Sequence, residues 1–379
     1  MLILKRIIED QIIESLVPNK VVVLVGPRRV GKTILINQVI NRLGEPYMLL
    51  NGEDFETLDL LKNQSIQNYR NILGDLSLLV IDEAQKIPDI GSKLKLMVDH
   101  IKGLRILVTG SSALDIANYT GEPLTGRKTT YNLYALSEQE FNQIENLIEK
   151  KSNLKQRLVY GNYPELIHLS TNEQKVEYLR EVINSYLLKD ILAFENIKNS
   201  EKIFDLLRLI AYRIGSEVSL QKLGAKLYMS KNTVEKYLDL LSKIFVLHKV
   251  RGFSQNLNKE ITKSSRWYFY DNGLRNLLIA NINPIDIRDD VGKLWENYII
   301  SERIKFQRYN KMVVNNYFWR TYDQQEIDWV EERGGKLYGY ELKWNPKRNP
   351  KEPIAWRKSY PNASYKVINR DNYPEWITK

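Results

Sequence analysis

Eight residues near the start of the chain constrain its fold more than any other feature. Residues 26–33 read Gly-Pro-Arg-Arg-Val-Gly-Lys-Thr, which matches the phosphate-binding pattern G-x-x-x-x-G-K-[ST]. An apolar, β-branched run from Val21 to Val25 precedes the pattern, and a helix-like stretch from Ile34 to Ile40 follows it. A strand, a glycine-containing loop and a helix in this order predict a parallel α/β domain that holds a phosphate chain.

The residue types of the loop predict which groups touch the phosphates. Backbone N–H groups curl around a β-phosphate, and the helix N-terminus adds partial positive charge. Lys32 is expected to reach the β- and γ-phosphates, and the Thr33 hydroxyl to ligate magnesium, so the predicted cofactors are ATP and Mg²⁺. The alternative is a chance glycine turn before a helix. The predicted nucleotide contacts of the loop are Gly26, Pro27, Arg28, Arg29, Val30, Gly31, Lys32, Thr33 and Ile34.

A pair of carboxylates supports this interpretation. The apolar run from Leu78 to Ile81 is typical of a buried parallel strand, and Asp82 and Glu83 follow it directly. Ligands of open α/β sheets bind at the carboxyl ends of strands. Asp82 is therefore predicted to hold the magnesium, and Glu83 to polarise the attacking water as the catalytic residue. Alternatively, the two acids only end a strand and cap the next helix.

Two further candidates follow the next strands. Residues 105–109 predict a strand that ends in hydroxyl side chains, so Thr109 and Ser111 are candidates to sense the γ-phosphate, although such residues also cap helices. Arg127 lies in a loop before a strand predicted at 130–134. It is either a catalytic arginine finger in an oligomer or a structural cation of the loop.

Charge is unevenly distributed over the 379 residues. Residues 1–150 contain 17 Lys and Arg against 19 Asp and Glu, whereas residues 151–379 contain 39 against 27. The basic second part favours DNA as a partner, with a solvated lysine-rich surface as the alternative.

The absence of cysteine excludes disulfides, thiolate metal sites and cysteine nucleophiles. No membrane-spanning run and no signal-peptide pattern is visible, which predicts a cytoplasmic protein.

Residues 201–270 are typical of a winged helix. Helices are predicted near 201–213, from 220 to 227 and from 231 to 243, with Ser230 as the N-cap of the third. Strand-like runs at 245–250 and 266–270 enclose a polar loop, the predicted wing. The alternative is a module that only packs against protein. The candidate DNA contacts are Lys231, Asn232, Thr233 and Lys236 in the recognition helix, and Lys259 and Lys263 in the wing.

The last hundred residues carry a second group of charged side chains. Glu341 and Lys343 are two residues apart and therefore share one face of a predicted strand. Asp328 lies on the strand predicted to pair with it, and Glu296 lies on a helix predicted at 291–305. Carboxylates with a lysine suit metal-dependent phosphodiester cleavage, but alternating charge on a surface strand gives the same pattern.

The ordered set of motifs resembles a family of archaeal and bacterial AAA+ ATPases. Its members join a P-loop domain to a winged helix and a C-terminal domain of the PD-(D/E)XK nuclease-like fold. The matching blocks, besides the phosphate loop, are 79–85, 109–112, 124–127, 136–141, 161–165, 268–274 and 295–297, together with Glu-Ile-Asp at 326–328 and Glu-Leu-Lys at 341–343. In the C-terminal part, no Pro-Asp dipeptide precedes Glu-Leu-Lys, and Gln-Glu-Ile-Asp at 325–328 stands in its place.

The resemblance implies an α/β architecture in four segments. They are a P-loop AAA+ core at 1–145, a helical lid at 146–200, the winged helix at 201–270 and a restriction-endonuclease-like α/β domain at 271–379. It also implies a homo-oligomer, with a ring as one form. The leading hypothesis is an Mg²⁺-dependent ATPase that remodels DNA or moves along it. The alternatives are an ATP-dependent nuclease and a nucleotide-dependent switch or scaffold that binds a protein partner.

Overall fold

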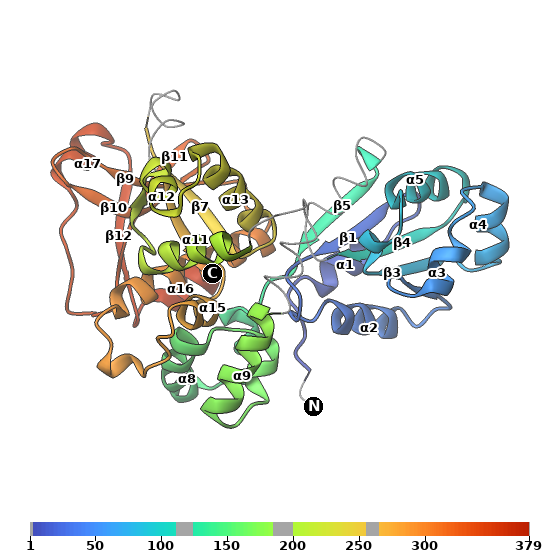
Figure 1. Ribbon diagram of the computed structural model, residues 1–379, viewed down its shortest axis with the longest axis horizontal. Coiled ribbons are helices and arrows are strands. Elements are labelled where there is room, and N and C mark those ends of the chain that lie inside the picture. The colour runs from blue at the N-terminus through green and yellow to red at the C-terminus, as the bar shows by residue number, and fades with distance from the viewer. Residues whose placement is uncertain (1–2, 111–123, 185–199, 255–264, 379) are drawn as a thin grey trace. The chain divides into compact units, whose positions relative to one another are not determined.

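The computed structural model describes residues 3–110, 124–184, 200–254 and 265–378 (Figure 1). Two compact units divide the chain. The first contains Met1–Ala135 with Lys243–Phe245, and the second contains Leu136–Ser242 with Val246–Lys379. Each unit is built around its own β-sheet.

The sheet of the first unit has five parallel strands in the order β2-β3-β4-β1-β5. Every residue of the interior strand β1 is buried, as expected for a parallel sheet with both faces covered. Strand β4 separates β1 from β3, so the phosphate loop and the acid pair follow strands that are not neighbours. The strands are β1 Val21–Val25, β2 Met48–Asn51, β3 Leu78–Asp82, β4 Arg105–Gly110 and β5 Lys128–Asn132.

The helices of the first unit begin and end where local signals place them. Helix α2 starts directly after Gly31 and stops at Gly44, both of which have the positive φ that glycine adopts without strain. Its buried side chains recur at helical spacing and face the sheet. The helices are α1 Glu9–Ser15, α2 Lys32–Leu43, α3 Phe55–Leu60, α4 Ile66–Leu73, η1 Ala84–Lys86 and α5 Ile90–His100.

The second unit opens with short helices whose starts are fixed by capping boxes. Ser137, Asn146 and Thr171 each accept a backbone hydrogen bond from the residue three positions on, whose side chain returns the bond. These helices are α7 Glu138–Phe141, α8 Leu147–Tyr160, η3 Pro164–Ile167 and α9 Asn172–Val182. The later helices are α11 Ser200–Tyr212, α12 Leu220–Leu227, α13 Lys231–Lys243, α15 Asn272–Leu278, η5 Ile285–Ile287, α16 Val291–Tyr309, α17 Ile354–Ser359 and α18 Tyr373–Thr378.

One seven-stranded sheet runs through the second unit, in the order β12-β11-β10-β9-β7-β8-β6. Strands β7 and β9 pair in parallel and so join the segment predicted as a winged helix to the C-terminal segment. Helix α16 lies against this sheet, and Trp295, Ile299 and Ile300 on it are fully buried. The strands are β6 Glu217–Val218, β7 Leu247–Gly252, β8 Ser265–Phe269, β9 Asn315–Arg320, β10 Glu326–Arg333, β11 Lys336–Lys343 and β12 Ser364–Asn369.

Most predicted elements are present, with shifts of a few residues at their ends. Helices α12 and α13 have the predicted bounds, whereas α16 continues to Tyr309 instead of ending at 305 because its last turns are also buried. Strand β5 begins at Lys128, two residues before the prediction. The four-segment division of the chain stays a prediction. None of the described helices has both the length and the apolar character needed to cross a bilayer.

Candidate functional site

The loop at 26–33 forms a tight cradle at the end of β1 (Figure 1). A side chain at Gly26 would put its Cβ 2.1 Å from the Leu133 carbonyl oxygen, so only glycine fits there. Gly31 has a φ of 93°, and Arg29 also has positive φ. This backbone turns the loop sharply into the N-terminus of α2, the geometry that directs amide groups at an anion.

Lys32 and Thr33 carry the chemistry of the loop. The Lys32 side chain is buried, and its Nζ donates to the carbonyl oxygens of Gly26 and Pro27, each at 3.0 Å. The ammonium is thus held across the mouth of the loop. Thr33 is exposed, and its Oγ1 donates to Oδ2 of Asp82 over 2.8 Å. Although β1 and β3 are not neighbours, the structure brings the predicted metal ligands together.

Thr109 organises the acid pair. Its hydroxyl is fully buried, donates to Oδ1 of Asp82 and accepts from the Glu83 amide at 3.0 Å. Glu83 has a φ of 50°, a left-handed conformation that costs a non-glycine residue energy and needs such contacts to persist. Gln85 donates from Nε2 to Oε2 of Glu83 at 2.5 Å. Thr109 therefore contacts both acids, and its role as a sensor of the γ-phosphate stays a prediction.

Arg6 is a residue that the sequence patterns did not single out. Its side chain is buried, and it donates to the carbonyl oxygens of Val30 and Tyr134, both at 2.7 Å. The guanidinium thus ties the phosphate loop to the segment that follows β5. No motif marks this arginine, because its role depends on where the N-terminal segment packs.

The remaining candidates of the first unit have different outcomes. The Nε atom of Arg127 lies 2.6 Å from Oδ1 of Asp99, so this arginine forms an ion pair within its own chain. Ser111 lies outside the described residues.

The second group of predicted residues also comes together, in the sheet of the second unit. The Lys343 Nζ lies 2.5 Å from Oε1 of Glu341 and 3.2 Å from Oδ2 of Asp328. Asp328 also accepts from the Leu342 amide at 2.9 Å. Glu296, on α16, joins this group through two side chains of strand β8.

Two residues of β8 complete this group and were missed from the sequence. Tyr268 donates its hydroxyl to Oε1 of Glu296 at 2.6 Å. Arg266 is buried, pairs with Glu326 at 2.8 Å, and has its Nη1 about 4 Å from both Glu296 and Asp328. We call Arg266, Tyr268, Glu296, Asp328, Glu341 and Lys343 the carboxylate network. Because side chains alternate along β8, Arg266 and Tyr268 lie on the same face of this strand. No local sequence signal shows which distant residues that face contacts.

Burial shifts the acid–base properties of the network. Burial, reinforced by the charge of Asp328, raises the pKa of Glu296 to about 8 and that of Glu341 to about 7. Burial alone would lower the pKa of Lys343, but Asp328 and Glu341 together raise it above its usual range. Near neutral pH, protons and internal cations therefore both serve to balance these carboxylates.

The two sites fit a metal to different degrees. Mg²⁺ bound with a nucleotide takes one or two protein oxygens and the rest from phosphates and water, and Thr33 and Asp82 supply such a pair. Throughout the described parts of the chain, no group of three or more His, Cys, Asp or Glu side chains is arranged to hold a metal. In the carboxylate network, Lys343 lies where it binds both Asp328 and Glu341.

The recognition-helix candidates lie at the start of α13. Lys231, Asn232 and Lys236 are exposed, and Thr233 is half-buried. Ser230 accepts from the Thr233 amide at 3.1 Å, which confirms the predicted N-cap. Lys259 and Lys263 fall in a segment that the structure does not describe.

Family models match three consecutive parts of the chain. Residues 18–142 match an AAA domain. Residues 151–285 match a domain of unknown function (DUF8612), and residues 291–376 match another domain of unknown function (DUF4143).

Relatives that match most of this chain occur in bacteria and archaea. An uncharacterised protein of Mycobacterium tuberculosis is 25% identical over 347 residues, which cover 90% of this chain and 74% of the relative. An uncharacterised protein of Methanocaldococcus jannaschii is 24% identical over 393 residues, with 96% of this chain and 84% of the relative covered.

Two solved structures share parts of the fold at low similarity. The RuvB Holliday junction branch migration motor of Thermotoga maritima is 19% identical, with a TM-score of 0.32, and the match covers 60% of this chain and 81% of RuvB. A STAND protein with a tetratricopeptide repeat sensor from Pyrococcus horikoshii is 15% identical, with a TM-score of 0.33 and coverage of 82% and 48%. The part of the chain that matches the AAA domain, residues 18–142, contains the phosphate loop and the whole parallel sheet of the first unit.

Proposed function

We propose that this protein is a magnesium-dependent ATPase that binds DNA and uses ATP hydrolysis to remodel DNA or to move along it. The observation that carries the ATPase part is the meeting of Thr33, on helix α2, and Asp82, at the end of strand β3, beside Lys32 at the mouth of the phosphate loop. This is the arrangement that phosphoryl transfer needs, because its catalysis consists of positioning and charge stabilisation.

Each residue in and around the phosphate loop has a separate proposed role in ATP hydrolysis. Bound magnesium neutralises charge on the β- and γ-phosphates, and the Thr33 and Asp82 oxygens would hold it there. Lys32 exchanges its two carbonyl acceptors for phosphate oxygens, and Glu83, released from Gln85, orients the attacking water. Thr109 keeps both acids in place. In a homo-oligomeric ring, Arg127 would have to leave Asp99 in order to reach a neighbour's nucleotide.

Calorimetry with Mg-ATP tests the central part of this proposal. The chain should bind one Mg-ATP with micromolar affinity, and Lys32→Met should weaken binding at least about tenfold because a charge-assisted contact is lost. Lys20→Met, which removes an exposed lysine just before β1, is the control. A chain with Lys32 intact that shows no heat of binding for Mg-ATP would refute the ATPase function.

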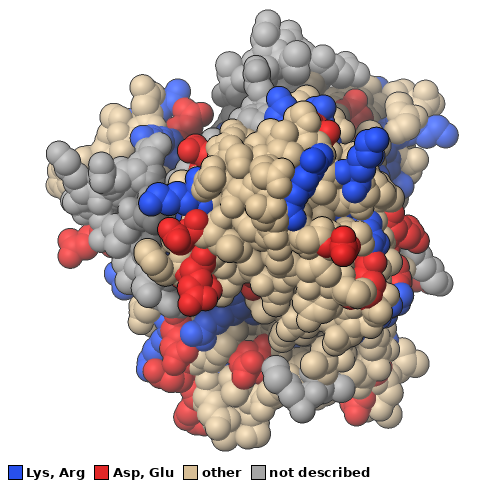
Figure 2. Space-filling view, turned by 90° about the vertical axis from the view of Figure 1, so that its right-hand side faces the viewer, with Lys and Arg blue, Asp and Glu red and all other residues tan. Residues whose placement is uncertain are grey.

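The DNA part rests on the segment from 200 to 269. Its order of α11, β6, α12, α13, β7 and β8 supports the proposed winged helix, and the exposed start of α13 presents Lys231 and Asn232. The surplus of Lys and Arg after residue 150 adds long-range attraction for phosphates. On the face shown in Figure 2, by contrast, Lys and Arg are interspersed with Asp and Glu.

Gel shifts over single-stranded, duplex and four-way DNA, with and without ATP, test this part. Lys231→Gln should weaken binding a few-fold on every sequence and reduce the salt slope by roughly one, as expected for a phosphate contact. Lys226→Gln at the end of α12 is a matched control. Binding without salt dependence, and an ATPase rate that no DNA changes, would favour the switch or scaffold that binds a protein partner.

The carboxylate network supports a second candidate, metal-dependent nuclease action. Helix α16 followed by β9, β10 and β11, with β12 parallel to β11, is the arrangement expected of a restriction-endonuclease-like domain. Asp328, Glu341 and Lys343 meet in it, with Glu296 nearby. Plasmid incubated with Mg²⁺ or Mn²⁺ should be cut by the wild type and not by Asp328→Ala. Cleavage that survives this substitution would contradict the assignment.

A further inference from the structure

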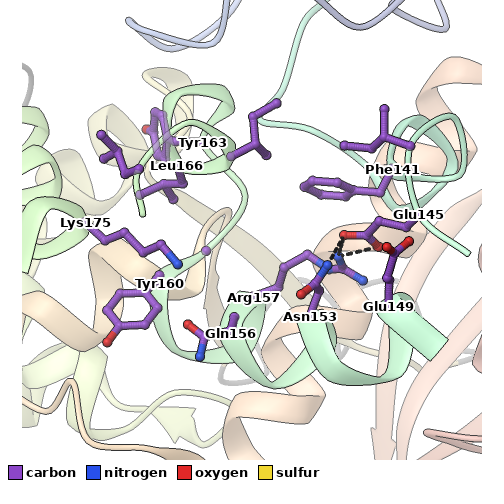
Figure 3. A pocket seen from close by; sticks show the side chains of 14 residues that line it. Phe141, Glu145, Glu149, Asn153, Gln156, Arg157, Tyr160, Tyr163, Leu166 and Lys175 are labelled. Atoms are coloured by element: carbon purple, nitrogen blue, oxygen red, sulfur yellow. Dashed lines mark hydrogen bonds and ion pairs between the residues drawn. The ribbon is translucent and has the colours of Figure 1, made fainter. Parts of the chain in front are cut away.

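A cavity of about 430 Å³ lies among helices α7, α8 and α9 and the turn η3 (Figure 3). All the residues that line it belong to the second unit, and none is part of the phosphate loop or of the carboxylate network. Its volume is in the range of small-molecule sites. Neither the motifs nor the proposed function gives this cavity a role.

The frame around the cavity is fixed by hydrogen bonds. The capping boxes at Ser137, Asn146 and Thr171 set the starts of the three helices that surround it. Each box satisfies backbone donors at both of its ends, so the helix starts are held without help from a ligand. A cavity between elements fixed in this way is pre-formed, which lowers the entropy cost of binding.

One side of the cavity is apolar. Phe141, Tyr163 and Leu166 line it and are buried in the surrounding structure. In Figure 3 the rings and aliphatic side chains of this wall lie above the polar groups of α8. This wall would gain free energy by covering an apolar ligand body, at about 25 cal/mol per Å² of area removed from water.

The opposite side presents a cation whose charge no carboxylate balances directly. Lys175 is half-buried, with its Nζ 5.3 Å from the centre of the Tyr160 ring, and none of the ion pairs among the described residues includes it. Burial lowers the pKa of Lys175, because the charged form has lost water without gaining an anion. Burial and Glu173 raise the pKa of Tyr160, so its hydroxyl stays a donor.

Arg157 is a second cation at the cavity, and one of its guanidinium nitrogens lacks a hydrogen-bond acceptor. Its Nη1 binds both oxygens of Glu145 at 2.7 and 2.8 Å, and its Nε binds Glu138 at 2.9 Å. Its Nη2, however, is buried and has no hydrogen-bond partner, which is costly for a charged group. A partner that supplied an acceptor would offset this cost.

The acids that line the cavity, Glu145 and Glu149, lie away from Lys175, whereas Glu173, outside the lining, acts on the Tyr160 hydroxyl. Glu145 is neutralised by Arg157, and Glu149 caps the start of α8 by accepting from the Asn146 amide. Figure 3 shows both acids at the end of the cavity that is far from Lys175 and Tyr160. The cavity is thus divided into an apolar wall, an acidic end that is already paired, and a cationic end.

We propose that this cavity is a binding site for a small molecule that joins an apolar, ring-sized body to a single anionic group. The anion lies beside the Lys175 ammonium, and the body covers Phe141, Tyr163 and Leu166. The site is independent of the nucleotide, so its test needs no ATP and does not depend on ATPase activity.

Fluorescence titration with two matched probes tests the proposal on the full chain. 8-Anilinonaphthalene-1-sulfonate carries an apolar body and one anion, and N-phenyl-1-naphthylamine has the same body without the charge. One saturable sulfonate site per chain is expected, with weaker binding of the amine. Lys175→Met should weaken sulfonate binding about tenfold and leave the amine within about twofold, since a charge-assisted contact is worth roughly 1.5–3 kcal/mol.

Two further variants complete the design. Lys151→Met removes an exposed lysine of helix α8 that does not line the cavity, and it should change neither affinity. Gln156→Trp at the exposed rim should weaken both probes by filling the cavity, with an unchanged melting temperature as evidence of folding. The absence of saturable binding, or sulfonate binding that Lys175→Met does not weaken, would overturn the proposal.

Discussion

The phosphate loop and the carboxylate network place similar groups in opposite situations. In the loop, Lys32 donates to the neutral carbonyl oxygens of Gly26 and Pro27, each at 3.0 Å, and Thr33 is exposed. In the network, Lys343 binds two carboxylates, and Arg266 lies about 4 Å from two. The first site can exchange weak internal contacts for phosphates, whereas the second has internal cations that a metal would have to displace.

The contrast between the two lysines indicates what a pre-formed site for a charged ligand requires. Protein–protein hydrogen bonds to neutral carbonyls contribute little net free energy, so a phosphate chain replaces them readily. An ion pair inside a buried network is costly to break, because the partner is left as an uncompensated charge. We therefore expect substitutions in the loop to change function, and substitutions in the network to change stability and its pH dependence.

The largest expected effect is at Glu83. Glu83→Gln removes the carboxylate that orients water, so ATP hydrolysis should fall at least about 100-fold, as general-base losses do. ATP affinity should stay within about twofold, because Glu83 lies outside the phosphate loop. Phosphate release and calorimetry measure the two quantities, and Glu56→Gln on the exposed face of α3 is the control. Full hydrolysis by the Gln variant would remove Glu83 from the mechanism.

The second prediction concerns stability and pH in the network. Glu296 and Glu341 have pKa values of about 8 and about 7, above the value of 4.5 for the free side chain. The folded state holds these protons more tightly than the unfolded chain, so this contribution to stability is complete below about pH 4.5 and is lost as the pH rises through 7 to 8.

Glu296→Gln removes the carboxyl group with the higher of the two pKa values. The unfolding free energy of the variant should therefore depend less on pH than that of the wild type. Between pH 5 and pH 8, we expect the wild type to lose roughly 2 kcal/mol more unfolding free energy than the variant. Urea midpoints at three pH values measure it, with Glu235→Gln on the exposed face of α13 as the control. If the unfolding free energies of the wild type and Glu296→Gln depended on pH in the same way, protonation of Glu296 would not contribute to the stability of the network.

The third prediction sharpens the role of Thr109. Thr109→Val keeps the shape of this buried side chain but removes the hydroxyl that contacts Asp82 and Glu83. Hydrolysis should fall about tenfold with little change in the KM for ATP, because a positioning contact is lost and not a phosphate contact. Thr109→Ser should restore the rate. A rise in KM with an unchanged kcat would instead place Thr109 at the nucleotide.

The smallest expected effect tests the internal cation of the network. Lys343→Met leaves Asp328 and Glu341 without the ammonium that now binds both, so Mn²⁺ should bind about fivefold more tightly, which corresponds to roughly 1 kcal/mol. Titration followed by Mn²⁺ electron paramagnetic resonance measures it, and Lys336→Met at the other end of β11 is the control. Weaker Mn²⁺ binding in Lys343→Met would mean that the lysine supports the metal site and does not compete with it.

The parts of this molecule that were predictable are those encoded within a few neighbouring residues. The strand, loop and helix around residues 21–43 follow from apolar runs, glycine positions and one motif, and the bounds of α12 and α13 follow from Ser219 and Ser230 as caps. Alternation along β11 placed Glu341 and Lys343 on one face. Such signals are local, because the helix and strand periods act over one or two turns or a few strand positions.

Only the tertiary structure decided which distant segments meet. It placed β4 between β1 and β3, joined β7 to β9 in one sheet, and brought Arg6 to the phosphate loop and Arg266 to the carboxylate network. It also enclosed the cavity beside Lys175. These contacts link residues far apart in the chain, and their choice depends on how the whole core packs, which no local pattern of residues contains.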